Sequence, residues 1–251
     1  AGPALRRPAL QIVFRQPRLD HAPPQRRRQP VERRQPPPHQ PRDAQQRDRD
    51  QRRERQRQTR AELGLTVESP VLLVSGGSQG ARSLNRATEQ AADEFLARGV
   101  QILHVWGPKN FPADAEPRTN PQSGARYVPL AYVDDMATAY AAADVMLARS
   151  GAGTVVETAM VGLPTILVPL PIGNGEQSLN AEPVVAAGAA RLVADAELDA
   201  ERLLSEVDEL LAQREQMSQA GRDLMRSDAA DELARRVLVE IQQRRQAGEG
   251  K

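Results

Sequence analysis

The sequence predicts an α/β fold for residues 61–251, a Rossmann-like parallel β-sheet with helices on both faces, preceded by a disordered basic tail over residues 1–60. Three observations predict it. Short apolar runs of strand type alternate with segments of helical periodicity, which is the pattern of a parallel sheet covered by helices. Two of these runs lead directly into a glycine-rich turn and a helix. The composition changes abruptly near residue 60, from Arg, Gln and Pro to ordinary globular sequence.

The composition excludes several kinds of site. The 251 residues include no cysteine, so there is no disulfide, no thiolate metal site and no cysteine nucleophile. The three histidines are scattered along the sequence, and we expect neither a metal nor a cofactor. No apolar run reaches the roughly 18–20 residues of a membrane-spanning helix, and the N-terminus lacks the apolar stretch of a signal peptide.

The tail and the body carry opposite charges. Residues 1–60 hold 17 of the 34 basic residues and 6 of the 33 acidic ones, a balance of +11, whereas residues 61–251 carry −10. The tail also holds 10 of the 20 prolines. Such a segment buries too little apolar surface to fold, so we expect disorder, although the Pro-free stretch Gln45–Arg60 leaves room for a helix.

Two further interpretations of the tail stay open. In the first interpretation, the tail is a basic arm that binds nucleic acid or anionic lipid. Against it, the tail has no lysine, and its aromatic content is limited to Phe14. Alternatively, residues 1 to about 58 are an out-of-frame translation of a GC-rich coding sequence, with the true frame resuming near Thr59. Reading the upstream DNA in the other two frames tests this hypothesis.

The first part of the body predicts strands and helices in alternation. In order, these are a strand Val71–Val74, a glycine-rich turn Ser75–Ala81, a helix with apolar positions from Leu84 to Leu96, a strand Gln101–Trp106, a polar loop over residues 107–125 and a strand Arg126–Leu130. The histidine inside the second strand, His104, is interpreted as a structural residue.

The second part repeats the pattern. Its predicted elements are a helix Ala137–Ala143 capped by Asp134 or Asp135, a strand Asp144–Ala148, a helix with apolar positions Val155, Val156, Ala159 and Met160, a strand Thr165–Val168, a helix Val184–Ala187, a strand Ala190–Val193 and helices from Asp199 onward.

The segment Arg149–Pro183 organises the predicted site. Its turn, Ser150–Thr154, follows a strand and opens a helix that Gly162 and Pro164 end. Glycines in this turn let the backbone approach a ligand, and the helix start offers unpaired N–H groups to a diphosphate. Glu157 lies one turn into the helix, within reach of ribose hydroxyls. On the turn alone, the structural interpretation comes first, in which the helix simply starts after a tight turn and the helix dipole favours Glu157 as an acid in the first turn.

Five motifs, taken together, give residues 62–245 a resemblance to the C-terminal, donor-binding domain of the MurG family of bacterial peptidoglycan glycosyltransferases. The motifs are GGSQGAR-LN at 76–85, YVDDMATAY at 132–140, RSGAGT with Glu157 at 149–157, GLPTILVPLP at 162–171 and EQ-LNA at 176–181. The resemblance implies the C-terminal half of a glycosyltransferase-B fold that needs no metal. It implies transfer of N-acetylglucosamine from UDP-N-acetylglucosamine to lipid I, giving lipid II.

The resemblance also implies roles for ten residues of a donor site. Val133 contacts the uracil, Glu157 binds the ribose hydroxyls, and Arg149 stands beside the nucleotide. Backbone and hydroxyl donors for the diphosphate come from Ala152, Gly153 and Thr154. The remaining four residues face the donor or its sugar: Ser78, Gln79, Gln177 and Asn180.

The departures from the family concern its N-terminal domain. That domain carries a glycine-rich loop with a histidine, which is the expected catalytic base. No such motif occurs in this sequence. We therefore expect the donor-binding half only and identify no catalytic residue. The expected partners are UDP-N-acetylglucosamine, lipid I if an N-terminal domain is supplied, and the cytoplasmic face of the bacterial cell membrane, bound peripherally.

Two alternatives to this function stay open. The first is a UDP-sugar-binding or nucleic-acid-binding protein with a basic arm and no transferase activity of its own, although nucleic acid is not the expected partner. Deleting residues 1–60 tests the role of the arm: if UDP-sugar binding stays intact and only salt-sensitive polyanion binding is lost, the tail is an accessory. The second is another UDP-sugar enzyme of similar fold, such as a 2-epimerase, which the EQ-LNA and GGSQGAR-LN motifs disfavour.

Overall fold

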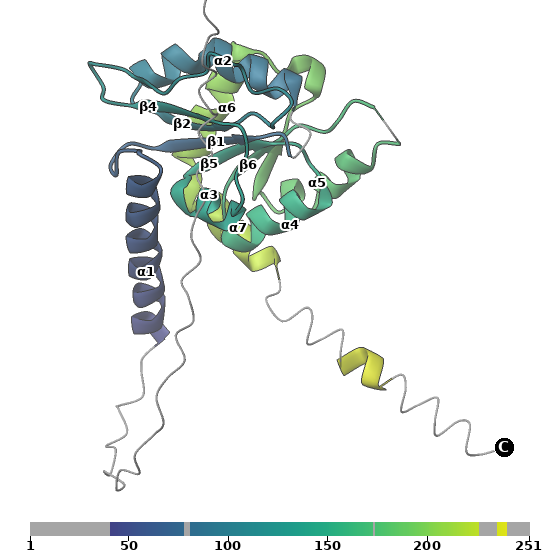
Figure 1. The fold of residues 1–251 in the computed structure, drawn as a ribbon. Coiled ribbons are helices and arrows are strands. Elements are labelled where there is room, and N and C mark those ends of the chain that lie inside the picture. Colours follow the sequence, from purple (N-terminus) through teal and green to yellow (C-terminus); the bar gives the residue numbers. More distant parts are fainter. Residues whose placement is uncertain (1–40, 78–80, 173, 226–234, 240–251) are drawn as a thin grey trace, which may run out of the picture.

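The computed structural model describes residues 41–77, 81–172, 174–225 and 235–239 (Figure 1). Within these residues the chain forms a seven-stranded sheet of order β3-β4-β2-β1-β5-β6-β7. The strands are β1 (Val71–Ser75), β2 (Gln101–Val105), β3 (Arg118–Thr119), β4 (Arg126–Leu130), β5 (Val145–Ala148), β6 (Thr165–Leu167) and β7 (Ala190–Leu192). All neighbouring strands pair in parallel except β3, which runs antiparallel to β4.

Helices cover both faces of the sheet, as the sequence predicts (Figure 1). The described helices are α1 (Pro41–Glu62), α2 (Arg82–Ala97), α3 (Met136–Ala142), α4 (Ala152–Val161), α5 (Glu176–Ala186), the 3₁₀ turn η1 (Asp195–Glu197), α6 (Ala200–Ala212) and α7 (Arg214–Leu224), with a further helical stretch over residues 235–239. In Figure 1, α2 and α6 lie on one face and α3 and α4 on the other.

The central strand β1 shows why its sequence is a continuous apolar run. Successive side chains of a strand point to opposite faces. Leu72 and Val74 pack in the cluster that contains α2 and α6 residues, whereas Val71 and Leu73 pack in the cluster that contains α3 residues. Both faces are therefore buried, and a parallel strand in that position carries apolar residues without alternation.

The chain enters this sheet at its centre and builds it in two directions. From β1 it runs outward through β2 to β4, then returns to place β5 on the other side of β1, and continues outward to β6 and β7. The loops that follow β1 and β5 thus leave neighbouring strands in opposite directions. In an open parallel sheet such a switch point forms a crevice at the carboxyl edge, where ligands bind.

The disorder expected for residues 1–60 is wrong for their C-terminal third. Residues 41–60 belong to α1, which includes the Pro-free stretch where the sequence left room for a helix. The last turn is part of the folded domain, because Arg60 is only 4% exposed and pairs with buried Asp144. Residues 1–40 lie outside the described part of the chain, and so does the expected disorder there.

Two other predicted boundaries differ from the structure. The strand β3 lies inside the segment 107–125 that the sequence predicts as a loop, where it adds a two-residue antiparallel edge. The helix α5 begins at Glu176 rather than near Val184, and Pro183 lies inside it. On α4, Val155 and Ala159 are buried as predicted, but Val156 and Met160 are about half exposed.

Candidate functional site

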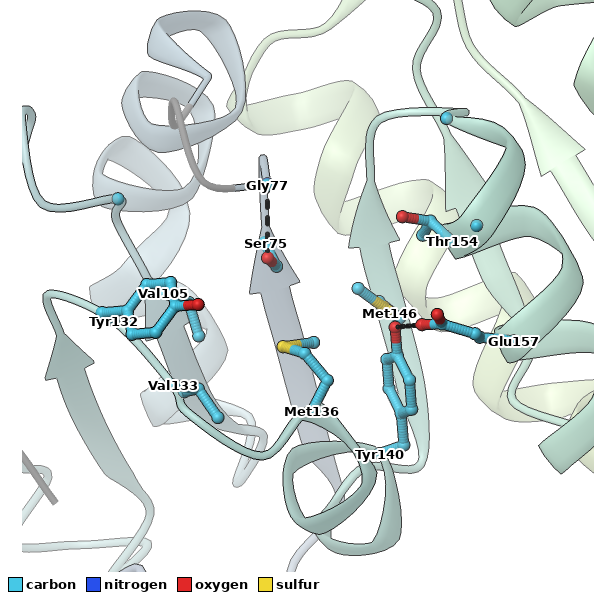
Figure 2. Close-up of a pocket in the computed structure, with 13 residues that line it drawn as sticks. Ser75, Gly77, Val105, Tyr132, Val133, Met136, Tyr140, Met146, Thr154 and Glu157 are labelled. Carbon is cyan, nitrogen blue, oxygen red and sulfur yellow. Dashed lines mark hydrogen bonds between the residues drawn. The ribbon is translucent and has the colours of Figure 1, made fainter. Parts of the chain in front are cut away.

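A pocket of about 320 Å³ lies at the carboxyl edge of the sheet, at the switch point between β1 and β5 (Figure 2). Its walls come from the loops after β1 and β2, from the segment that leads into α3, and from the start of α4. A volume of this size is in the range of small-molecule sites. The topology therefore places a ligand-sized hollow where the glycine-rich turns converge.

The start of α4 supplies the polar wall of the pocket. Gly151, Gly153 and Thr154 line it. Gly151 is the N-cap in an extended conformation, and no side chain of the described residues caps this end. The first N–H groups of a helix have no partner within the helix, and its dipole places positive charge there. This wall is therefore suited to a phosphate or diphosphate.

The opposite wall is mainly apolar. Val105 of β2 and Met136 of α3 line it, together with Tyr132 and Val133 from the loop before α3, whereas Met146 of β5 lines the pocket beside Glu157 (Figure 2). Val133 is 7% exposed, whereas Tyr132 is 44% exposed at the rim. Flexible methionine and planar tyrosine side chains suit a flat heterocycle.

Tyr140 of α3 and Glu157 of α4 form a hydrogen-bonded pair on the α4 side of the pocket (Figure 2). The Tyr140 hydroxyl donates to Oε2 of Glu157 over 2.8 Å. Burial raises the pKa of Tyr140 well above its usual value, and the hydrogen bond to Glu157 and its negative charge raise it further. The phenol therefore stays protonated as the donor, and the carboxylate has its other lone pairs available for a ligand.

The loop after β1 is anchored by its first residues. The backbone N–H of Gly77 donates to Ser75 Oγ over 3.4 Å, and both residues line the pocket. Gly77 has φ of +80°, a conformation that a residue with Cβ rarely adopts. Ser78 and Gln79, which the sequence analysis assigns to this loop, lie outside the described residues.

Arg149 is not among the residues that line the pocket. Its guanidinium donates to Asp195 over 2.5 Å, to Ser83 Oγ over 2.9 Å and to the carbonyls of Val168 and Pro169. Burial alone would raise the pKa of Asp195, but hydrogen bonds from Ser83 and Arg149 and nearby positive charge outweigh it and hold that pKa low. Here Arg149 ties the end of β5 to α2 and η1.

The predicted sugar-facing residues support loops in this structure. Asn180 donates to the carbonyl of Ser150 over 3.2 Å, and Gln177 Oε1 accepts from the N–H of Leu170 over 3.0 Å. Neither lines the pocket, and nor does Ala152, which is exposed at the first position of α4. The structure therefore brings together Val133, Gly153, Thr154 and Glu157 of the predicted set.

The sequence analysis gave no site role to several residues that line the pocket. They include Ser75, Met136, Tyr140 and Met146. One signal could have found two of them, because Met136 and Tyr140 are four residues apart on a helix and so share a face. Within the described ranges, no group of three or more His, Cys, Asp or Glu side chains could hold a metal. No described helix combines the length and apolarity that crossing a bilayer requires.

Comparison with known proteins identifies the domain. Residues 71–235 match the model of the glycosyltransferase family 28 C-terminal domain. A UDP-N-acetylglucosamine--N-acetylmuramyl-(pentapeptide) pyrophosphoryl-undecaprenol N-acetylglucosamine transferase of Cutibacterium acnes is 59% identical over 186 residues, which cover 72% of this chain and 49% of the relative. The transferase of the same name from Streptomyces avermitilis is 50% identical, with 73% of this chain and 51% of the relative covered.

Solved structures give the same picture of the fold. The crystal structure of Acinetobacter baumannii MurG superposes with a TM-score of 0.56 at 27% identity, over 70% of this chain and 51% of that one. The calicheamicin glycosyltransferase CalG4, at 23% identity and a TM-score of 0.52, shares the fold over 70% of this chain and 44% of its own. The chain thus spans about half the length of the relatives it matches. Residues 71–235 place the chain in the glycosyltransferases that carry the family 28 C-terminal domain.

Proposed function

We propose that this chain is the donor-binding half of a peptidoglycan N-acetylglucosaminyltransferase, with UDP-N-acetylglucosamine as donor and lipid I as acceptor. The observation that carries the proposal is the pocket itself, in which an uncapped helix start, a carboxylate and an apolar wall surround about 320 Å³. These three features match the diphosphate, the ribose and the base of a nucleotide. The activity for which the relatives are named supplies the sugar and the acceptor.

Within this proposal, each part of the donor has a place. The diphosphate lies at the start of α4 against Ala152, Gly153 and Thr154, and the uracil lies against Val133. Glu157 takes the ribose hydroxyls. Gln177 and Asn180 meet the sugar after a side-chain rearrangement, because both now hold loop backbone. We propose that Ser78 and Gln79, which lie outside the described residues, face the donor.

The chemistry that this half supplies is charge stabilisation. In the transfer, an acceptor hydroxyl attacks the anomeric carbon while the bond to the diphosphate oxygen breaks, and UDP leaves with the negative charge. N–H groups and a helix dipole already aimed at that oxygen stabilise the charge as it develops. Deprotonation and positioning of the acceptor belong to the acceptor-binding half of such an enzyme. Because the acceptor is linked to a lipid, we infer that the enzyme acts as a peripheral protein at the cytoplasmic face of the cell membrane.

The test is a calorimetric titration of the chain with UDP, UDP-N-acetylglucosamine and GDP. We expect binding of both uridine nucleotides and none of GDP. Replacing Glu157 by Ala should weaken UDP binding by about 1.5–3 kcal/mol, the range for hydrogen bonds to a charged group. The fold should survive, because this side chain is exposed.

The matched control is Glu182→Ala, which removes an exposed carboxylate from α5 outside the pocket and should leave UDP affinity unchanged. Equal binding of UDP and GDP, or an unchanged affinity in Glu157→Ala, would contradict the proposed function.

A further inference from the structure

We propose that Tyr140 is a positioning residue that orients Glu157 for the ribose diol and so sets the preference for ribonucleotides over deoxyribonucleotides. The inference rests on the proposed donor site, and it adds a residue to which neither the sequence analysis nor the comparisons give a role. It starts from the hydrogen bond between Tyr140 of α3 and Glu157 of α4 at the edge of the pocket (Figure 2).

The two partners differ in how far they are buried. Tyr140 is 8% exposed, and its ring packs in the cluster of α3 and β5 residues that includes Ala139 and Met146. Glu157 is exposed on α4 and reaches the pocket by a long, rotatable side chain. A fixed donor 2.8 Å from Oε2 therefore restricts a side chain that is otherwise free to turn to solvent.

The position of Tyr140 is itself fixed at both ends of α3. At the N-terminus, Asp135 accepts from the N–H of Ala137 over 3.0 Å and from the Thr138 hydroxyl over 2.6 Å. At the C-terminus, Arg60 Nε of α1 donates to the carbonyl of Ala142 over 2.9 Å. The phenol is thus held by a short helix that its own N-cap residue stabilises at one end and that α1 contacts at the other.

The consequence for binding follows from the geometry of a carboxylate. An ionised carboxylate accepts about four hydrogen bonds, two at each oxygen. Tyr140 occupies one site on Oε2, which leaves Oε1 and the remaining site on Oε2 for two adjacent ribose hydroxyls. Fixing the carboxylate in advance removes part of the ordering cost of binding. The gain is larger for a ligand that has both hydroxyls than for one that has a single hydroxyl.

The experiment compares UDP with 2′-deoxy-UDP on the wild type and on Tyr140→Phe, which removes the hydroxyl and keeps the ring. We expect the wild type to prefer UDP, and Tyr140→Phe to weaken UDP binding about 3- to 10-fold while changing 2′-deoxy-UDP binding less. The ratio of the two dissociation constants should therefore fall toward one. In a Glu157→Ala background, adding Tyr140→Phe should have no further effect on UDP.

The matched control is Tyr127→Phe, which removes another tyrosine hydroxyl that donates to a glutamate, Glu89 Oε2, over 3.0 Å and outside the pocket. It should leave the ratio unchanged. An equal loss for both nucleotides in Tyr140→Phe would show a merely structural role and overturn the inference. Tighter UDP binding would show that Tyr140 competes with the ribose and would also overturn it. If Glu157→Ala leaves UDP binding unchanged, the proposed function fails first, and the positioning inference fails with it.

Discussion

His104 occupies the middle of β2 and is completely buried, although imidazole titrates near neutral pH in water. Its Nδ1 lies 2.9 Å from the Tyr127 hydroxyl and its Nε2 lies 3.2 Å from Asn85 Oδ1. The ring also stacks on Trp106 with centroids 4.4 Å apart. Burial lowers the pKa of His104 from 6.5 to about 3. The residue is a neutral packing element, as the sequence analysis interprets it.

The depressed pKa of His104 predicts a loss of stability in acid. Between pH 6.5 and 3 the unfolded chain binds a proton at this position that the folded chain does not. Stability is therefore complete above pH 6.5 and falls as the pH falls, with a slope that approaches about 1.4 kcal/mol per pH unit. Replacing His104 by Gln should remove that slope.

The measurement is urea unfolding of wild type and His104→Gln at pH 7 and pH 5. The wild type should lose about 2 kcal/mol more than the variant over this interval. Comparing the two proteins cancels the contribution of carboxyl groups such as Asp195. Equal losses would contradict the assigned pKa shift.

Single residues also show which features of the site could be predicted from the sequence. The placement of Glu157 beside the pocket could be predicted. The residue lies early in the helix that follows the glycine turn, so its side chain stays close to the helix start. Tyr140 could not be assigned, because its role depends on α3 and α4 meeting across β5. For Arg149, whose motif implies a place beside the nucleotide, the sequence could not reveal the partner of its guanidinium, Asp195, a residue 46 positions away.

At the scale of elements, Asp144 joins three segments just before β5. Its carboxylate accepts hydrogen bonds from Arg60 of α1, from Arg214 of α7 and from the N–H of Val71 at the start of β1. The Asp144 and Arg60 side chains are each 5% exposed. A buried ion pair with satisfied partners holds its elements in register, and loss of one partner leaves a buried charge.

Replacing Asp144 by Ala should therefore destabilise the domain by about 3–5 kcal/mol, the cost of leaving the Arg60 charge buried without its partner. Urea unfolding measures the loss. The control is Asp208→Ala, which breaks an ion pair with Arg98 whose side chains are 52% and 42% exposed and should have a far smaller effect. Similar losses in the two variants would contradict the structural role of Asp144.

The elements were predicted unevenly, for physical reasons. Buried parallel strands give continuous apolar runs, and Gly162 ends α4 with φ of +72° as its position after the last periodic residue indicated. The strand β3 has only two residues and no apolar run, so periodicity could not reveal it. The end of α1 was placed in the tail because its composition is basic, although Arg60 is held by a contact with a residue 84 positions later.

At the scale of the whole molecule, the order of strands and turns predicted the sheet and the edge that carries the site. The reversal at β1 then brings the two glycine-rich turns onto neighbouring strands. The order in which strands pair depends on contacts between distant residues. The sequence therefore predicts each glycine-rich turn separately, and the structure shows that the two turns lie next to each other. The out-of-frame origin of residues 1 to about 58 stays a proposal, and the upstream DNA tests it.

The central claim is that the pocket at this switch point binds the donor nucleotide. Its most direct test is a titration of isotope-labelled protein with UDP, followed through backbone amide NMR signals. The amides of Gly151, Gly153, Thr154 and Val133 should shift with one common dissociation constant, whereas those of Gly99 and Gly124, which do not line the pocket, should not. Saturable shifts confined to other segments, with the start of α4 unchanged, would contradict the account.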